Sequence, residues 1–185
     1  QRFFRAVPLP EGTCFESMTE AMCGFNVAGP DSRALLQRLT DTSLETQDFP
    51  FMWSKWIEMA GVQVLALRVS FTGGLGWELH CRTQDQARLY AALIAMAKDF
   101  DAGPVGSRAL MSLRIEKGYG SWGREFSPEY WPQEVGLDRL CKMDKVFLNS
   151  DALATTLARP ARERLVLLGL EAADTEASHA DATGG

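Results

Sequence analysis

The chain has 185 residues, 46% of them hydrophobic and 23% charged, which is enough for one substantial globular domain or for one domain and part of a second. A net charge of −5 without a basic cluster argues against a nucleic-acid partner, because that binding draws its affinity from neutralised phosphates. No apolar run approaches the roughly 20 residues that span a bilayer, so no membrane partner is expected either.

The cysteines predict neither a zinc site nor a disulfide framework. The four cysteines are Cys14, Cys23, Cys81 and Cys141. They are widely spaced, and no two of them form a CxxC pair. The chain has only two histidines, His80 and His179. This small number of imidazole side chains argues against both a metal site and a Ser-His-Asp triad. With the acidic, enzyme-like composition, this favours reduced, mostly buried thiols and a cytoplasmic location, or the mitochondrial matrix in a eukaryote.

Apolar periodicity and turn residues predict an irregular series of strands and helices. In chain order these are a strand that stops at Gly29-Pro30, a helix from residue 31 or 32, strands over 55–59 and 62–69, a glycine-rich turn and a strand to residue 79, helices over 84–100, 107–117 and 151–157, and a strand over 164–170. Strands and helices intermix without a βαβ rhythm. An α+β fold with mixed or antiparallel sheets and packed helices is therefore predicted.

Three further expectations concern burial and loops. The aromatic run 49–53 is expected to be buried, and the helix over 107–117 is expected to turn Leu110, Leu113 and Ile115 mostly inward. Residues 118–145 contain too many glycines and prolines for one regular element. Long ordered loops of this kind are often functional.

Residues 70–79, SFTGGLGWEL, are the most informative segment. The glycine-rich turn leads into a strand and not into a helix, which disfavours a phosphate site of the dinucleotide-binding type. Glu78 stands between Trp77 and Leu79, and a carboxylate there would suit a planar ligand edge with two adjacent N–H groups. The alternative, which the pattern alone favours, is an outward-facing glutamate on a half-exposed strand.

Other candidate ligand contacts lie further along the chain. Arg108 opens a helix after a Gly-Pro turn and could bind a carboxylate or a carbonyl oxygen. For Arg114, on the same helix, an internal salt bridge or a solvated face is the favoured interpretation. Tyr119 and Trp122 of the irregular loop could stack on an aromatic ligand, although loop aromatics more often pin a loop to the core.

Four blocks in order resemble the aminomethyltransferase family, which contains the glycine cleavage system T-protein and the folate-binding regions of dimethylglycine and sarcosine dehydrogenases. The blocks are residues 24–33, 70–79, 107–119 and 142–153. The second is similar to the family pattern S-Y-T-G-E-x-G-W/F-E. Details within residues 117–125 look closer to the dehydrogenase branch than to the T-protein.

The resemblance implies tetrahydrofolate as the cofactor. It implies that Glu78 holds the pterin edge and that Arg108 occupies a second folate-contacting position, with Phe71, Tyr119 and Trp122 completing the set. Phe71 replaces the family tyrosine and Gly74 replaces its acidic residue. The family's catalytic aspartate has no counterpart here, so no catalytic residue is assigned.

The resemblance also implies a domain organisation and a function. Residues 1–158 would form a central folate-binding domain without its N-terminal part, and residues 159–185 the truncated start of a C-terminal β-barrel domain. The expected function is tetrahydrofolate-dependent one-carbon transfer that captures the carbon released from an N-methyl amine of the dimethylglycine or sarcosine type, or from an aminomethyl donor. The chain alone is expected to be inactive, which leaves its status as an enzyme open.

Two alternatives remain, a folate-dependent demethylase of another methyl donor and a non-catalytic folate-binding or interaction domain. The expected partners are folate, a small-molecule substrate and, where the full protein has one upstream, a flavin dehydrogenase domain with FAD.

Overall fold

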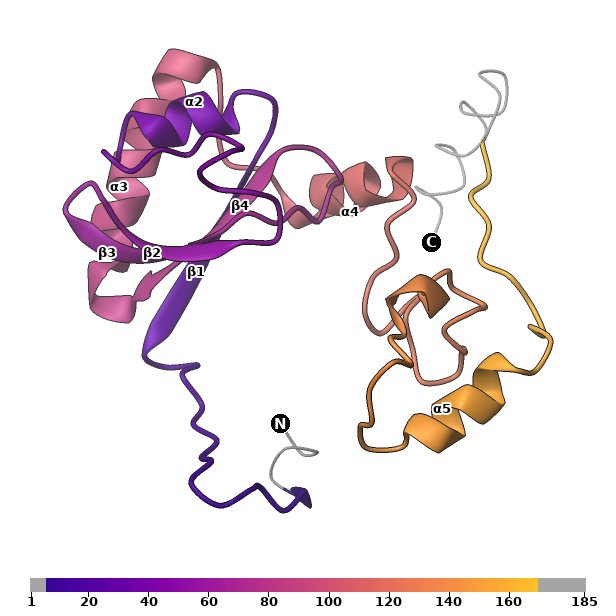
Figure 1. Cartoon of the computed structure of the whole chain (residues 1–185). Helices are drawn as coiled ribbons and strands as arrows, with labels where there is room; N and C mark the ends of the chain where they lie inside the picture. Colours follow the sequence, from indigo (N-terminus) through magenta and orange to yellow (C-terminus); the bar gives the residue numbers. More distant parts are fainter. Residues whose placement is uncertain (1–5, 170–185) are drawn as a thin grey trace, which may run out of the picture. The chain divides into compact units, whose positions relative to one another are not determined.

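The structure of this chain is a computed structural model that describes residues 6–169. They divide into two compact units, with the division between Met111 and Ser112 (Figure 1). The regular elements are β1 (Met22–Ala28), α2 (Ser32–Gln37), β2 (Ser54–Met59), β3 (Val62–Leu67), β4 (Gly76–Arg82), α3 (Gln86–Ala97), α4 (Ser107–Glu116) and α5 (Ser150–Leu157). Among these elements no helix is both long and apolar enough to cross a membrane.

The first unit is built on a four-stranded antiparallel sheet in the order β1-β4-β3-β2. A tight turn at Ala60 and Gly61 joins β2 to β3, and both residues have positive φ, 51° and 70°. Positive φ at both central residues matches the right-handed twist of a two-residue hairpin. The predicted combination of strands and packed helices is confirmed, and the sheet is antiparallel.

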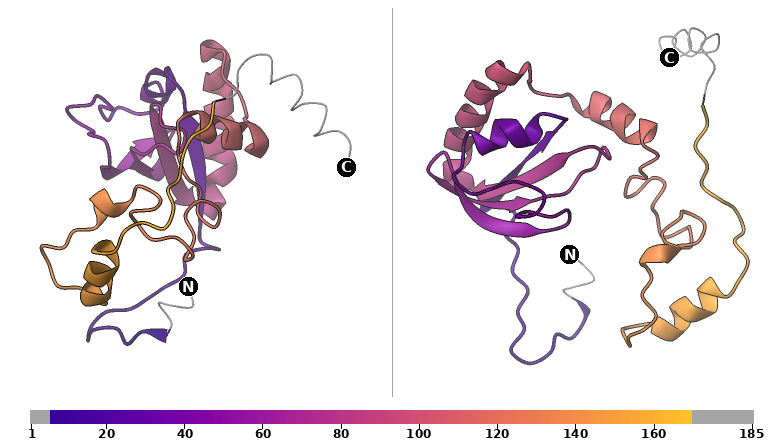
Figure 2. Two further views of the ribbon diagram at one scale, coloured as in Figure 1. Left: turned by 90° about the vertical axis from the view of Figure 1, so that its right-hand side faces the viewer. Right: turned by 45° about the horizontal axis from the view of Figure 1, so that its top comes forward.

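Helices α2 and α3 cover one face of this sheet, as Figures 1 and 2 show. The two helices contact each other, and α2 also contacts β4. Leu89, Leu93 and Ala97 recur every four residues on α3, so they lie on one side of the helix and are buried together. The core they enter contains side chains from three strands, Ile57, Met59, Val62, Val64, Ala66, Trp77, Leu79 and Cys81.

The other side of the sheet is called the open face here. Strand side chains alternate between faces, so residues between the buried positions point to this side. They are exposed or only partly buried, and they include Gly24, Asn26, Trp56, Glu58, Gln63, Leu65, Leu67, Glu78 and His80. The open face therefore combines polar groups, which all four strands supply, with apolar groups of β2 and β3.

The prediction that residues 49–53 are buried is wrong for most of the run. Only Phe49 enters the core, where its ring meets Trp77 edge-on at 5.1 Å. Phe51, Met52 and Trp53 are 59%, 70% and 53% exposed. The backbone turns at Met52, where φ is 69°, so only the first aromatic of the run can reach inward.

The expected orientation of α4 is also wrong. Leu113 and Ile115 are 42% and 49% exposed, whereas Arg114 is 2% exposed. The buried side of the helix is set by the loop that follows it, which supplies a carbonyl oxygen and a carboxylate for Arg114. A charged side chain with such partners takes the place that the apolar pattern had assigned to Leu113 and Ile115.

The predicted barrel strand over residues 164–170 is not confirmed. Residues 164–169 form no strand, and residue 170 lies outside the described residues. A strand needs a neighbouring strand for its backbone groups. In the described part of the second unit no strand lies beside this segment, and the N–H of Leu165 instead donates to the carbonyl oxygen of Glu134 at 2.7 Å.

Candidate functional site

Strand β4 places Glu78 on the open face of the sheet. Trp77 and Leu79 are fully buried on the core side, so the residue between them has to point the other way. The Glu78 side chain is 41% exposed, and its Oε2 lies 3.3 Å from Nε2 of His80, the next residue on the same face. The outward-facing interpretation of this glutamate is therefore confirmed, and the carboxylate is accessible.

The strands on either side of β4 define the surroundings of this carboxylate. Asn26 of β1 and Leu67 of β3 are the direct register partners of Glu78. Gly24 is the partner of His80, and a Cβ at Gly24 would lie 3.0 Å from Nδ1 of that imidazole. Because β1 has no side chain at this position, the imidazole can lie against the strand. The site thus offers a carboxylate, an amide and an imidazole beside an apolar surface.

The turn before β4 depends on Gly76. A Cβ there would meet the carbonyl oxygen of Val69 at 2.8 Å, which is closer than real contacts allow. Glycine therefore lets the chain close on itself immediately before Glu78, with Phe71 partly buried in the turn. A Cβ added at Gly74 would point into open space. The acidic residue of the family pattern would therefore fit at this position without a steric clash.

The remaining candidate residues are distributed over both units. Phe71, Glu78 and Arg108 lie in the first unit, and Arg108 is an exposed residue of the first turn of α4. Tyr119 and Trp122 lie in the second unit and are 46% and 85% exposed. The shared role of these five residues in binding stays a prediction.

Arg114 forms an internal ion pair, one of the two interpretations favoured for it. Its Nη1 donates to Oε2 of Glu125 at 2.8 Å and to the carbonyl oxygen of Tyr119 at 3.0 Å. The Ser121 N–H donates to the same carboxylate oxygen at 2.8 Å. These contacts, the Ser121 N–H first and then Arg114, hold the pKa of Glu125 below its ordinary value. The pair fastens the loop after α4 to the helix.

A second ion pair, between Glu134 and Arg162, was not predicted. Arg162 binds the buried carboxylate with Nε and Nη2, both at 2.8 Å, and its guanidinium lies 4.4 Å from the centre of the Trp131 ring. The hydrogen bonds from Arg162 lower the pKa of Glu134 to about 2. The partners are 28 residues apart, so no local pattern in the sequence links them.

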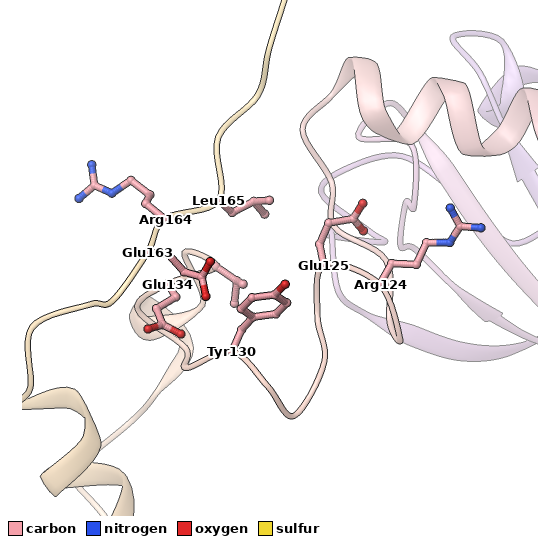
Figure 3. Close-up of a pocket in the computed structure, with 8 residues that line it drawn as sticks. Arg124, Glu125, Tyr130, Glu134, Glu163, Arg164 and Leu165 are labelled. Carbon is pink, nitrogen blue, oxygen red and sulfur yellow. The ribbon is translucent and has the colours of Figure 1, made fainter. Parts of the chain in front are cut away.

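An open pocket in the second unit lies beside these ion pairs (Figure 3). Its lining residues are Arg124, Glu125, Tyr130, Glu134, Val135, Glu163, Arg164 and Leu165. In Figure 3 the guanidinium groups of Arg124 and Arg164 point away from the acidic side chains. Two of these acidic side chains already form ion pairs, Glu125 with Arg114 and Glu134 with Arg162. Their negative charges therefore stabilise the packing of the loop.

Residues 3–145 match the family model of the GCVT N-terminal domain. The chain belongs to this family. The sequence is 34% identical to human mitochondrial dimethylglycine dehydrogenase over 163 residues, which are 87% of this chain and 19% of that protein. It is 39% identical to human mitochondrial sarcosine dehydrogenase over 149 residues, 80% of this chain and 16% of that protein. An aminomethyltransferase from Thermoanaerobacter is 29% identical over 152 residues, 82% of this chain and 41% of that protein.

The GCVT domain match confirms the resemblance found in the four sequence blocks. The chain spans about a fifth of the length of the two dehydrogenases. The matched range contains the whole open face and all five predicted folate contacts, and it ends before α5 and Arg162. The boundary predicted between residues 158 and 159 stays a prediction. Within residues 6–169, no group of three or more His, Cys, Asp or Glu side chains is arranged to hold a metal ion.

Proposed function

We propose that this chain forms the pterin-binding part of a tetrahydrofolate-dependent one-carbon transfer enzyme, with Glu78 holding the pterin. The observation that carries the proposal is the position of this carboxylate. It stands 41% exposed on the open face, directly opposite Asn26, immediately after a turn that only glycine closes. Membership of the GCVT N-terminal domain family and the aminomethyltransferase among its relatives support folate as the cofactor.

The residues of the open face fit a pterin by their hydrogen-bonding groups. The pterin edge carries two adjacent N–H donors beside a carbonyl oxygen. A carboxylate such as Glu78 accepts two parallel hydrogen bonds, and the side-chain amide of Asn26 can donate to the carbonyl. Leu65 and Leu67 of β3 supply apolar surface on the same face for the ring. Donors, acceptors and apolar area are therefore present within one patch of the sheet.

Tetrahydrofolate, when bound, supplies the nitrogen that accepts the one-carbon unit. The part of this chain is to bind and orient it, because a fixed position of the nitrogen beside the carbon donor lowers the entropic part of the barrier. Glu78 would set the direction of the ring, Phe71 would stack on it, and Arg108 would bind an anionic or carbonyl group of the cofactor. Tyr119 and Trp122 would add stacking surface. No residue of the chain is assigned as the acid or base.

The proposed carbon donor is an N-methyl amine of the dimethylglycine or sarcosine type. The names of the two dehydrogenase relatives support this donor and a flavin dehydrogenase domain with FAD as a partner in the full protein. In this proposal residues 1–158 form the folate-binding domain, and the protein works in the cytoplasm or the mitochondrial matrix. A non-catalytic folate-binding domain is the second candidate, which Phe71 and Gly74 favour because they depart from the family pattern.

Glu78→Gln tests the proposal. The substitution removes one charged acceptor, so tetrahydrofolate binding to the full-length protein should weaken by roughly 1.5–3 kcal/mol, which is about 10- to 150-fold in Kd. Titration calorimetry measures this change. Glu58→Gln is the matched control, because Glu58 is an exposed glutamate of the same face on β2. An unchanged Kd for Glu78→Gln, or an equal loss in both variants, would remove Glu78 from the pterin site.

The 185-residue chain alone should not turn over dimethylglycine or sarcosine. The expected reason is that oxidation of the amine is the part of the proposed flavin dehydrogenase domain, and that the chain offers folate contacts without a counterpart of the family's catalytic aspartate. The measurement is formation of the demethylated amine, in the presence of tetrahydrofolate and an electron acceptor, by the chain and by the full-length protein. Turnover by the chain alone would refute this assignment. Turnover by neither protein, with tetrahydrofolate still bound, would favour the non-catalytic domain.

A further inference from the structure

Two cysteines from distant parts of the chain lie opposite each other on adjacent strands of the sheet. Cys23 of β1 and Cys81 of β4 are direct register partners, and their sulfur atoms are 3.5 Å apart. Both belong to the side of the sheet that α2 and α3 cover. The expectation of mostly buried thiols is wrong, because Cys81 is buried, Cys23 and Cys141 are partly exposed, and Cys14 is exposed.

The backbone positions of the pair already suit a disulfide. Directly opposite residues of an antiparallel pair have Cα atoms about 4.5–5.5 Å apart, inside the range of roughly 4.4–6.8 Å that disulfides occupy. The two sulfurs have to approach by only about 1.5 Å to reach a bond length of about 2.05 Å. Within residues 6–169, strand β1 is at the edge of the sheet and pairs with β4 alone, so it can adjust without disturbing a second neighbouring strand there.

The two thiols differ in access. Cys23 is partly exposed, whereas Cys81 is 0% exposed. Burial, and then the hydrogen bond with Cys23, raise the pKa of Cys81 to about 12. The thiolate is the nucleophile in thiol–disulfide exchange, so an oxidant from solution should react first at Cys23.

We propose that Cys23 and Cys81 form a redox-modification site, in which a low-molecular-weight disulfide such as oxidised glutathione converts the two thiols into a cross-strand disulfide. The Cys23 thiolate attacks one sulfur of oxidised glutathione, so that a mixed disulfide forms and one glutathione thiolate leaves. Cys81 gives up its proton and attacks Sγ of Cys23, and the second glutathione leaves. Two protein thiols are oxidised, and one glutathione disulfide is reduced to two thiols.

The second step is favoured by the position of Cys81. Its sulfur lies 3.5 Å from that of Cys23, which makes the attack intramolecular and gives it a high effective concentration. Once Cys23 is in the mixed disulfide, it can no longer carry a negative charge beside Cys81, so the coulombic contribution of Cys23 to the raised pKa of Cys81 is removed. The finished disulfide joins β1 to β4 three residues from Asn26 and Glu78, and so fixes the two strands that carry these two side chains.

The test uses the 185-residue chain with Cys14→Ser and Cys141→Ser, two substitutions at positions outside the core. After incubation with oxidised glutathione, this variant should lose both remaining thiols, carry no glutathione adduct and give a Cys23–Cys81 peptide on non-reducing digestion. Its melting temperature should rise by roughly 4 °C or more, because the cross-link restricts the unfolded chain, and a thiol reductant should reverse the rise.

Adding Cys81→Ser to that variant provides the control, because Cys23 then has no resolving partner and should keep its glutathione adduct. A stable adduct at Cys23 while Cys81 is present would overturn the proposal. The proposal would also be overturned if both thiols stayed free after incubation with oxidised glutathione and became oxidised only after urea was added. A lower melting temperature of the cross-linked chain would overturn it too. These readouts require no folate, so they stand apart from the test of Glu78.

Discussion

Replacing Trp77 with alanine is expected to lower the free energy of unfolding of the first unit by about 4 kcal/mol, in the range for deleting a buried aromatic side chain. Trp77 is 0% exposed and is the largest side chain that the core buries completely. Its ring meets Phe49 edge-on at 5.1 Å, and the Arg68 guanidinium lies 5.9 Å from the ring centre. The substitution would remove these contacts and leave a cavity beneath β4.

The matched control is Trp56→Ala. Trp56 belongs to the same sheet but lies on the open face and is 61% exposed, so its loss should change the free energy of unfolding by no more than about 0.5 kcal/mol. Urea unfolding followed by far-ultraviolet circular dichroism measures both variants. Similar losses for Trp77→Ala and Trp56→Ala would contradict the assignment of the two faces.

Replacing Arg114 with methionine is expected to cost the second unit about 3 kcal/mol, the lower end of the range for breaking a buried ion pair. Methionine keeps much of the length of the side chain but cannot donate a hydrogen bond. It would leave both Glu125 and the Tyr119 carbonyl oxygen without their guanidinium donor, although the Ser121 N–H would still donate to Glu125. Glu125 is 28% exposed, so water would recover part of the loss.

Hydrogen exchange locates this effect. The amide of Ser121 donates to Glu125 and that of Tyr119 donates to the Arg114 carbonyl, so both should exchange about 100-fold faster in Arg114→Met. Lys117→Met is the control, because Lys117 is exposed just beyond the end of α4. Unchanged exchange at both amides in Arg114→Met would show that the ion pair does not hold the loop.

Most elements of the first unit could be predicted from the sequence because their signals are local. Alternating apolar residues and the Ala60-Gly61 turn identify the β2–β3 hairpin, and a four-residue apolar repeat identifies α3. The failures come from segments whose packing partners are not local. Residues 164–169 have strand-like composition but no strand beside them in the described part of the second unit, and α4 buries Arg114 because a later loop supplies its partners.

The sequence by itself determined the family of this chain and its most informative residue. Four blocks in order indicated the family, which the match over residues 3–145 confirms, and they singled out Glu78. Only the tertiary structure decided which way Glu78 points and what surrounds it, because its face follows from the burial of Trp77 and its neighbours follow from the register with β1 and β3. The same holds for Cys23 and Cys81, which are 58 residues apart, because contacts at such separations depend on how strands pair and not on local pattern.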